Sequence, residues 1–280
     1  MLFPRVSCRL DRFIDCLLIK VVKITPKANL KESIHNLVEE LGGFKRFIST
    51  GDVVFVKPNF NTADPFPASS DVEFLKCLTE LLYQHGAKLV AIGDSSTVTL
   101  NTRKIMEKKG VFELLNSDTP PRMYVFEEGR WVKSAISSPI LKSVSIPEIV
   151  TKADKIIYVP CLKTHKQAQY TGALKLTVGF VKPIERIRMH LKNLQEKVAL
   201  INTVIKPDLV IMDARKCFIT RGPTEGEIRE PNLLLASTGR VAIDCAGVKI
   251  IQSFKGNSLS HIKIPTDIPQ IKTAIELGIY

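Results

Sequence analysis

Short, continuous apolar runs recur along the chain, and most of them are followed by apolar residues at helical spacing. A short apolar run between turn signals is typical of a strand that is buried on both faces. The predicted strands are Leu17–Ile24, Asp52–Val56, Lys88–Ile92, Ile156–Val159, Asp208–Met212 and Leu233–Ala236. Their alternation with helices predicts an α/β fold of three layers, with a mostly parallel central sheet and helices on both faces.

Helix signals lie between these strands. Asn29 and Asp71 are expected to cap two helices, because apolar residues at helical spacing follow each of them. A single amphipathic helix is predicted from Leu191 to Ile205, and Pro207 is expected to end it. The other predictions are helices over residues 102–109, 241–254 and 269–277, and a pair of strands formed by Tyr124–Phe126 and Trp131–Ile136.

Residues 18–280 are expected to form one α/β domain, since no repeat or low-complexity tract interrupts the pattern. Residues 1–17 match no element and are interpreted as an N-terminal extension, either flexible or produced by a misassigned start. Their charges, among them Arg5, Asp11 and Arg12, break any apolar core of a secretory signal. No apolar run approaches the roughly 20 residues of a membrane span, so the prediction is a cytoplasmic protein without a membrane partner.

The six cysteines are scattered, and no two of them form a Cys-x-x-Cys pair. Scattered cysteines in a chain of this size indicate reduced thiols. The pattern also offers no self-contained ligand run for an iron–sulfur cluster, so no intrinsic cluster is expected.

Positive charge is concentrated in one window. The whole chain carries a formal charge of +12, and Lys152–Lys192 contributes nine Lys or Arg against only Asp154 and Glu185. The window directly follows a predicted strand, which favours a site for an anionic small molecule. Nucleic acid is the weaker interpretation, because only Tyr170 and Phe180 interleave with the cations.

Polar residues follow several predicted strands at the point where each strand ends. Ligands of open α/β sheets bind beyond the carboxyl ends of the strands, so these residues are expected to converge on one crevice. The candidate ligand-binding residues are Lys57, Asn59, Asp94, Ser95, Lys163, Lys175, Gly222 and Gly226. The candidate catalytic residues are His165, His190 and Asp213. No Walker-type or Gly-x-Gly-x-x-Gly loop accompanies them.

Each of these residues also has a plainer interpretation. The lysines could only solvate loops, and Asp94 and Asp213 could cap turns. His165 and His190 could transfer protons, bind a metal or donate hydrogen bonds to the ligand; the identity of any metal stays open. Asp244, inside an apolar helix, requires a partner for its carboxylate.

The ordered motifs resemble those of the domain-of-unknown-function family 362. The matching residues are Lys57-Pro58-Asn59, Gly93-Asp94-Ser95, Pro160 with Lys163-Thr164-His165, Thr171-Gly172-Ala173-Leu174-Lys175, Gly179, His190, Asp213, Gly222-Pro223 with Gly226, and Ala242 with Asp244. Many members of this family carry a ferredoxin-like module with iron–sulfur clusters, and this sequence has no such cysteine run. Any redox role would therefore need electrons from a separate electron-transfer protein or from a bound cofactor whose identity is unknown.

Three functional hypotheses follow. The first is a redox-linked enzyme, an oxidoreductase or a metal-dependent enzyme, that acts on an anionic small molecule in a basic crevice. The second is a non-catalytic protein that binds an anionic ligand or cofactor, and the third and weakest is a nucleic-acid-binding protein.

Overall fold

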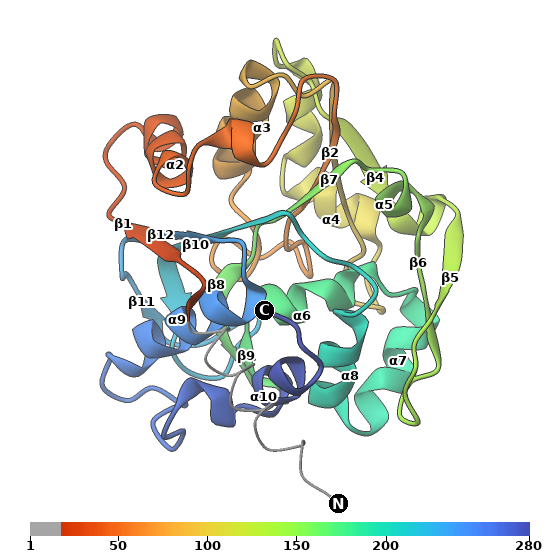
Figure 1. Cartoon of the computed structure of the whole chain (residues 1–280), viewed down its shortest axis with the longest axis vertical. Helices are drawn as coiled ribbons and strands as arrows, with labels where there is room; N and C mark the ends of the chain where they lie inside the picture. The colour runs from red at the N-terminus through yellow and green to blue at the C-terminus, as the bar shows by residue number, and fades with distance from the viewer. Residues whose placement is uncertain (1–17) are drawn as a thin grey trace, which may run out of the picture.

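A computed structural model describes residues 18–280, so the prediction for residues 1–17 lies outside the described residues. The core of the fold is a central sheet of strand order β1-β12-β10-β7-β2-β3-β4 (Figure 1). In that order the strands are Val21–Ile24, Leu233–Ser237, Leu209–Phe218, Lys155–Tyr158, Val53–Lys57, Leu89–Asp94 and Arg122–Val125. Neighbours from β10 to β4 are parallel, and within this order only β12 runs against the other strands, antiparallel to both β10 and β1. The predicted mostly parallel sheet is confirmed.

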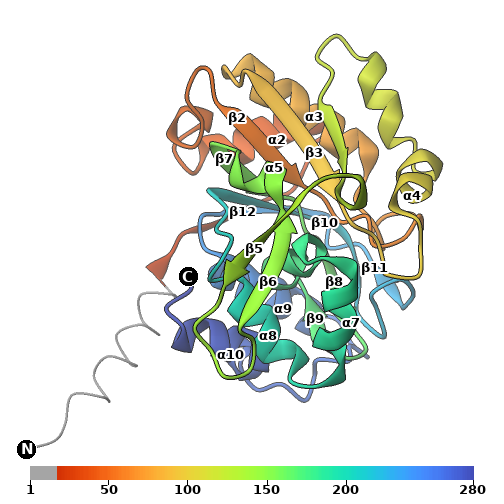
Figure 2. The same cartoon turned by 90° about the vertical axis from the view of Figure 1, so that its right-hand side faces the viewer.

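Helices cover both faces of this sheet (Figure 2). On one face lie α2 (Leu30–Glu39), α3 (Val72–Gln84) and α4 (Thr102–Lys108). On the other lie α6 (Ala173–Leu176), α8 (Leu194–Ile201), α9 (Arg240–Gln252) and α10 (Pro269–Glu276). Side chains of a strand alternate between faces, and accordingly Val54 and Val56 join the first apolar core while Phe55 joins the second. This double burial explains the continuous apolar runs in the sequence.

The predicted caps set the orientation of two helices. Asn29 Oδ1 accepts a hydrogen bond from the Glu32 amide at the start of α2, and Asp71 does the same for the Glu73 amide at the start of α3. Such caps satisfy amides that have no partner inside the helix. Gly86 then ends α3 with a φ of +101°, in the left-handed region that favours glycine. No helix of residues 18–280 has both the length and the apolar character needed to cross a bilayer.

Two local predictions are wrong. The segment 122–125 does not pair with 131–136; it forms β4 and extends the sheet beside β3, while β5 (Trp131–Ala135) pairs with β6 (Ser143–Pro147). The single helix expected over 191–205 is shorter: α8 covers Leu194–Ile201, and Leu191 ends a separate helix, α7 (Pro183–Leu191). Asn193 adopts a φ of +53° between them, which breaks the helix, and Leu191 is 77% exposed at the end of α7.

The basic segment after β7 is a hairpin rather than a loop. It consists of β8 (Cys161–His165) and β9 (Gln169–Thr171), and β8 pairs with an extension of β10. That extension also pairs with the short strand β11 (Ile228–Arg229). Alternate residues of a strand share a face, so this hairpin determines where Lys163 and His165 point. The remaining short elements are α5 (Glu148–Thr151) and the 3-10 turns Phe44–Arg46, Val111–Asn116, Phe126–Glu128, Thr177–Phe180 and Pro265–Asp267.

Candidate functional site

A cavity of about 480 Å³ lies beyond the carboxyl ends of β2 and β3, between the β8–β9 hairpin and helices α6 and α7. Most of the residues predicted for the site line it. These are Lys57, Asn59, Asp94, Ser95, Lys163, His165, Lys175 and His190. They come from segments far apart in the sequence, as expected for strand ends that meet at one edge of a sheet. Their roles in binding or catalysis stay predictions.

Lys57 and Asp94 form a buried ion pair at the floor of the cavity. Lys57 Nζ lies 2.6 Å from Asp94 Oδ1 and also donates to the Pro58 carbonyl at 2.7 Å. The other carboxylate oxygen of Asp94 accepts from the Phe60 amide at 2.6 Å. Gly179 packs against the pair so tightly that a Cβ there would lie 2.8 Å from Asp94 Oδ1. Burial lowers the pKa of Lys57, and the attraction of Asp94 opposes that shift.

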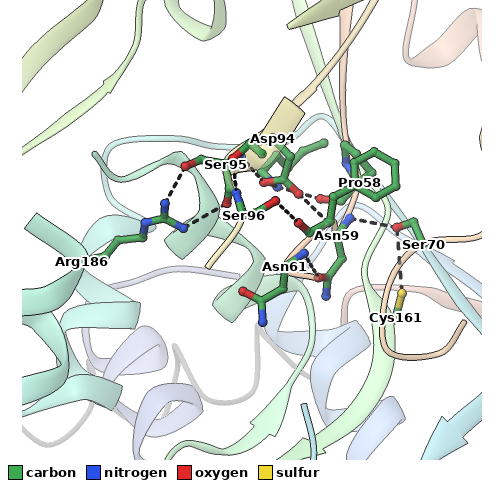
Figure 3. Close-up of polar contacts among 12 residues, drawn as sticks. Pro58, Asn59, Asn61, Ser70, Asp94, Ser95, Ser96, Cys161 and Arg186 are labelled. Atoms are coloured by element: carbon green, nitrogen blue, oxygen red, sulfur yellow. Dashed lines mark hydrogen bonds and ion pairs between the residues drawn. The ribbon is translucent and has the colours of Figure 1, made fainter. Parts of the chain in front are cut away.

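Arg186, from α7, is a further cation of the cavity that the sequence analysis did not single out. It is 5% exposed and donates from Nη1 to the Ser95 carbonyl at 3.0 Å (Figure 3). Figure 3 also shows Asn59, whose amide donates to Ser70 Oγ at 2.8 Å. Arg186 sits in the basic window, but its burial depends on how α7 packs, and the sequence pattern does not show that packing.

Lys163 and Lys175 are held in different ways. Lys163 is fully buried and donates from Nζ to the carbonyl of Ala68. Lys175 Nζ faces the cavity and has no hydrogen-bond or ion-pair partner among the described residues. Burial lowers the pKa of Lys175 to about 8, with further lowering by the nearby charges of Lys163 and Arg186. Burial likewise lowers the pKa of Lys163 to about 8.

Asp244 fixes the helix that carries Lys175. Its two carboxylate oxygens accept from the amides of Ala173 at 2.6 Å and Leu174 at 3.0 Å, which are the first residues of α6. The partner that the buried carboxylate requires is therefore this helix start rather than a cation of the cavity. Gly172 permits the close approach, because a Cβ there would lie 2.1 Å from Asp244 Oδ1. Burial raises the pKa of Asp244 to about 7, against the lowering effect of these amides.

The two histidines present different atoms to the cavity. His165 Nδ1 lies 3.1 Å from the amides of both Gln167 and Ala168 and accepts from them, so the ring proton is on Nε2. Burial lowers the pKa of His165 to about 2, with help from Lys175, Lys163 and His190. His190 Nδ1 lies 2.7 Å from the Arg186 carbonyl and must donate to it, which leaves Nε2 as an acceptor. His165 can donate a hydrogen bond, and His190 can accept a proton.

Asp213 does not reach the cavity, because it lies inside β10 rather than at its end. It is 2% exposed and pairs with Arg215, whose Nη2 lies 2.7 Å from Asp213 Oδ2 and 2.6 Å from Asp71 Oδ2. The carboxylate therefore belongs to a structural cluster beneath α3. The sequence does contain a sign of this ion pair: Arg215 follows Asp213 by two residues, so both side chains lie on the same face of the strand.

Gly222 and Gly226 are also absent from the cavity lining, although Pro223 is part of it. A Cβ at Gly222 would lie 1.8 Å from the Thr164 carbonyl, and one at Gly226 would lie 2.1 Å from the Thr220 carbonyl. Both glycines thus allow a loop to pack closely on itself and on β8. Cys161 is 1% exposed, and burial raises the pKa of its thiol to about 11, so it behaves as a small apolar residue.

Metal ligands are sparse in this part of the fold. Within residues 18–280 no group of three or more His, Cys, Asp and Glu side chains is placed to hold a metal ion. His190 Nε2 has a free lone pair, whereas Asp94 is already occupied by Lys57 and backbone amides.

The sequence of this chain matches the model of one protein family. The model of the domain of unknown function family DUF362 matches residues 54–249, which include most of the cavity, and the chain belongs to this family. A thylakoid-associated protein of Synechocystis sp. is 29% identical over 233 residues, which cover 80% of this chain and 70% of that protein.

Two solved structures resemble this chain to different degrees. The lactate racemase apoprotein from Thermoanaerobacterium thermosaccharolyticum gives a TM-score of 0.52 at 11% identity over 90% of this chain. A crystal structure of a protein from Thermotoga maritima gives a TM-score of 0.46 at 12% identity over 92% of this chain. The chain spans only 60% of the length of either. The likeness to the racemase supports an α/β fold.

Proposed function

We propose that this protein is an enzyme that acts on an anionic small molecule bound in the cavity. The support is an imbalance of charge: the described lining contains four cations, Lys57, Lys163, Lys175 and Arg186, and one acid, Asp94. Outside the lining, Glu127 Oε1 lies 4.0 Å from Arg186 Nη2, which still leaves positive charge in excess. Attraction between charges is strong in a partly desolvated cavity. An anion that binds in the cavity would neutralise part of this excess positive charge.

Lys175 is the observation that carries this proposal. Lys175 is half-buried, and a lysine that is taken partly out of water without a partner loses favourable hydration. Lys57 has Asp94 and Lys163 has a carbonyl, whereas Lys175 faces open space beside two further cations. A carboxylate or phosphate group of the ligand would supply the missing acceptor.

The histidines support a catalytic role beyond binding. His190 presents a basic Nε2 to the cavity, and His165 presents an Nε2–H donor, so one can move a proton and the other can orient an oxygen. On this proposal His190, and not His165, transfers the proton. The redox part of the proposal rests on the family resemblance, and it requires a separate electron-transfer protein or a bound cofactor.

Calorimetric titration with inorganic phosphate tests the binding step. Loss of a charge-assisted hydrogen bond costs about 1.5–3 kcal/mol, so Lys175→Met should weaken phosphate binding roughly 10- to 100-fold. Lys255→Met, at an exposed site outside the cavity, is the matched control and should bind as the wild type does. Absence of phosphate binding by the wild type would contradict the proposal.

A second measurement separates an enzyme from a non-catalytic binding protein. Pyruvate incubated with the protein in deuterated water should exchange its carbon-bound hydrogens if His190 transfers protons, and His190→Gln should abolish the exchange. Phosphate binding without exchange would favour the binding protein. Salt-sensitive binding to DNA without phosphate binding would favour the nucleic-acid hypothesis.

A further inference from the structure

We propose that Lys175 is a nucleophile that forms an imine with its ligand, so the substrate class is a small anion that carries an aldehyde or ketone group. This inference rests on the proposed function, because the anionic group must first bind in the cavity. The imine would make the ligand a better electron acceptor than the free carbonyl compound, which is the usual reason that enzymes form one.

The three lysines of the cavity differ in what surrounds their amino groups. Lys57 Nζ donates hydrogen bonds to Asp94 Oδ1 and to the Pro58 carbonyl. An adjacent carboxylate favours the protonated form of an amine. Lys163 Nζ is directed to the Ala68 carbonyl. Lys175 Nζ has neither kind of partner among the described residues, so it is free to turn toward a ligand.

The neighbours of Lys175 favour its neutral form. Lys163 and Arg186 place positive charge nearby, and a desolvated lysine next to another cation is activated as a nucleophile. Burial and these two charges lower its pKa to about 8, so a usable fraction of the amine is neutral in mildly alkaline solution. Neither Lys163 nor Arg186 could replace it, because one is bound to a carbonyl and the other keeps its proton.

The backbone beneath Lys175 is fixed. Asp244 binds the first two amides of α6, and Asn202 Nδ2 donates to the Leu174 carbonyl at 2.9 Å, directly before Lys175. A side chain that starts from a fixed position samples a small volume, which favours attack on a bound carbon. Gly172 is required for this arrangement, since any Cβ would clash with Asp244.

The proposed step is balanced without an external oxidant or reductant. The ammonium of Lys175 first attracts the anionic group together with Lys163 and Arg186, and it then gives a proton to His190 Nε2. The neutral amine forms a C–N bond with the carbonyl carbon, and its nitrogen gives one proton to the carbonyl oxygen, which accepts a hydrogen bond from His165 Nε2–H. Proton return from His190 lets that oxygen leave as water, and a protonated imine remains. The overall charge is unchanged.

Reductive trapping with glyoxylate tests this inference, because cyanoborohydride converts an imine into a stable secondary amine. Intact-mass analysis and peptide mapping should show one adduct on Lys175, formed faster as the pH rises through about 8. Excess phosphate should suppress this adduct and leave any labelling of exposed Lys255 unchanged. Lys175→Arg, which keeps a cation, should lose the adduct while weakening phosphate binding less than Lys175→Met does.

The outcomes separate this inference from the proposed function. Phosphate binding by the wild type without an adduct on Lys175 would overturn the imine alone. Absence of phosphate binding would overturn the proposed function as well. Equal labelling of the wild type and of Lys175→Arg would also overturn the imine, provided that thermal unfolding shows both proteins to be folded.

Discussion

Two groups of buried charges in this fold differ in how completely they are neutralised. Around Arg215, the carboxylates of Asp71 and Asp213 both lie within 2.7 Å of the guanidinium, and the rings of Phe66 and Phe74 cover it. In the cavity, by contrast, Asp94 neutralises Lys57 but leaves other cations in surplus. The charges around Arg215 therefore neutralise one another, whereas the lining of the cavity keeps an excess of positive charge.

Under the proposed function, this difference separates charges that hold the fold from charges that would bind a ligand. A partly desolvated charge without a partner lowers stability, so the half-buried Lys175 adds nothing to the stability of the fold. Sites that give up stability in this way are commonly functional. The Arg215 cluster joins β10 to the start of α3, because Asp71 caps that helix.

Breaking the group of charges around Arg215 should have the largest effect on stability. Arg215→Met would leave Asp71 and the buried Asp213 without a counter-charge, at a cost of about 3–5 kcal/mol in the free energy of unfolding. Urea unfolding measures this, and phosphate binding by the folded variant should be unchanged. Arg103→Met, which breaks an exposed pair with Glu128, is the control and should unfold near the wild-type midpoint. Equal losses in the two variants would contradict the comparison.

The stability that the buried carboxyl group of Asp244 contributes should depend on pH. Its pKa in the folded protein is about 7, above the value of about 3.9 in an unfolded chain, so between these values the folded state binds more protons. Stability contributed by this group therefore falls as pH rises from about 4 to 7, by roughly 3–4 kcal/mol. Urea unfolding across this range should show a flatter curve for Asp244→Asn than for the wild type. Parallel curves would show that the carboxylate titrates normally.

The smallest effect is expected at His165. Its lowered pKa of about 2 keeps the ring neutral, because burial and nearby cations oppose protonation. Nitrogen NMR of the folded protein should show an Nε2–H tautomer that does not titrate between pH 5 and 8. A titration near the usual histidine value of about 6.5 would restore His165 as a candidate for proton transfer.

The sheet could be predicted from the sequence because its strands are buried on both faces. Val53–Lys57 and Leu89–Asp94 are apolar runs that no solvent-facing strand would show. The β8–β9 hairpin could not be predicted in the same way, since Lys163 and His165 are typical of a loop. Their burial comes from pairing with β10, a contact between segments far apart in the chain.

The site was partly predictable for a related reason. Lys57 and Asp94 lie at strand ends, so the parallel sheet brings them together wherever the intervening helices run. Asp213 was misplaced because β10 continues past it, and Arg186 was missed because its position depends on α7 packing against Ser95. Local pattern determines which strands form, whereas long-range packing determines which charges remain unpaired.

Thermal unfolding of Lys175→Met with and without phosphate tests the central claim most directly. Because burial lowers the pKa of Lys175 to about 8, the charged amine destabilises the folded protein at pH 7, and its removal should raise the free energy of unfolding by up to about 3 kcal/mol. Phosphate should raise the Tm of the wild type and leave that of the variant nearly unchanged. A variant with a lower Tm than the wild type that phosphate still stabilises fully would show that Lys175 supports the fold rather than a ligand.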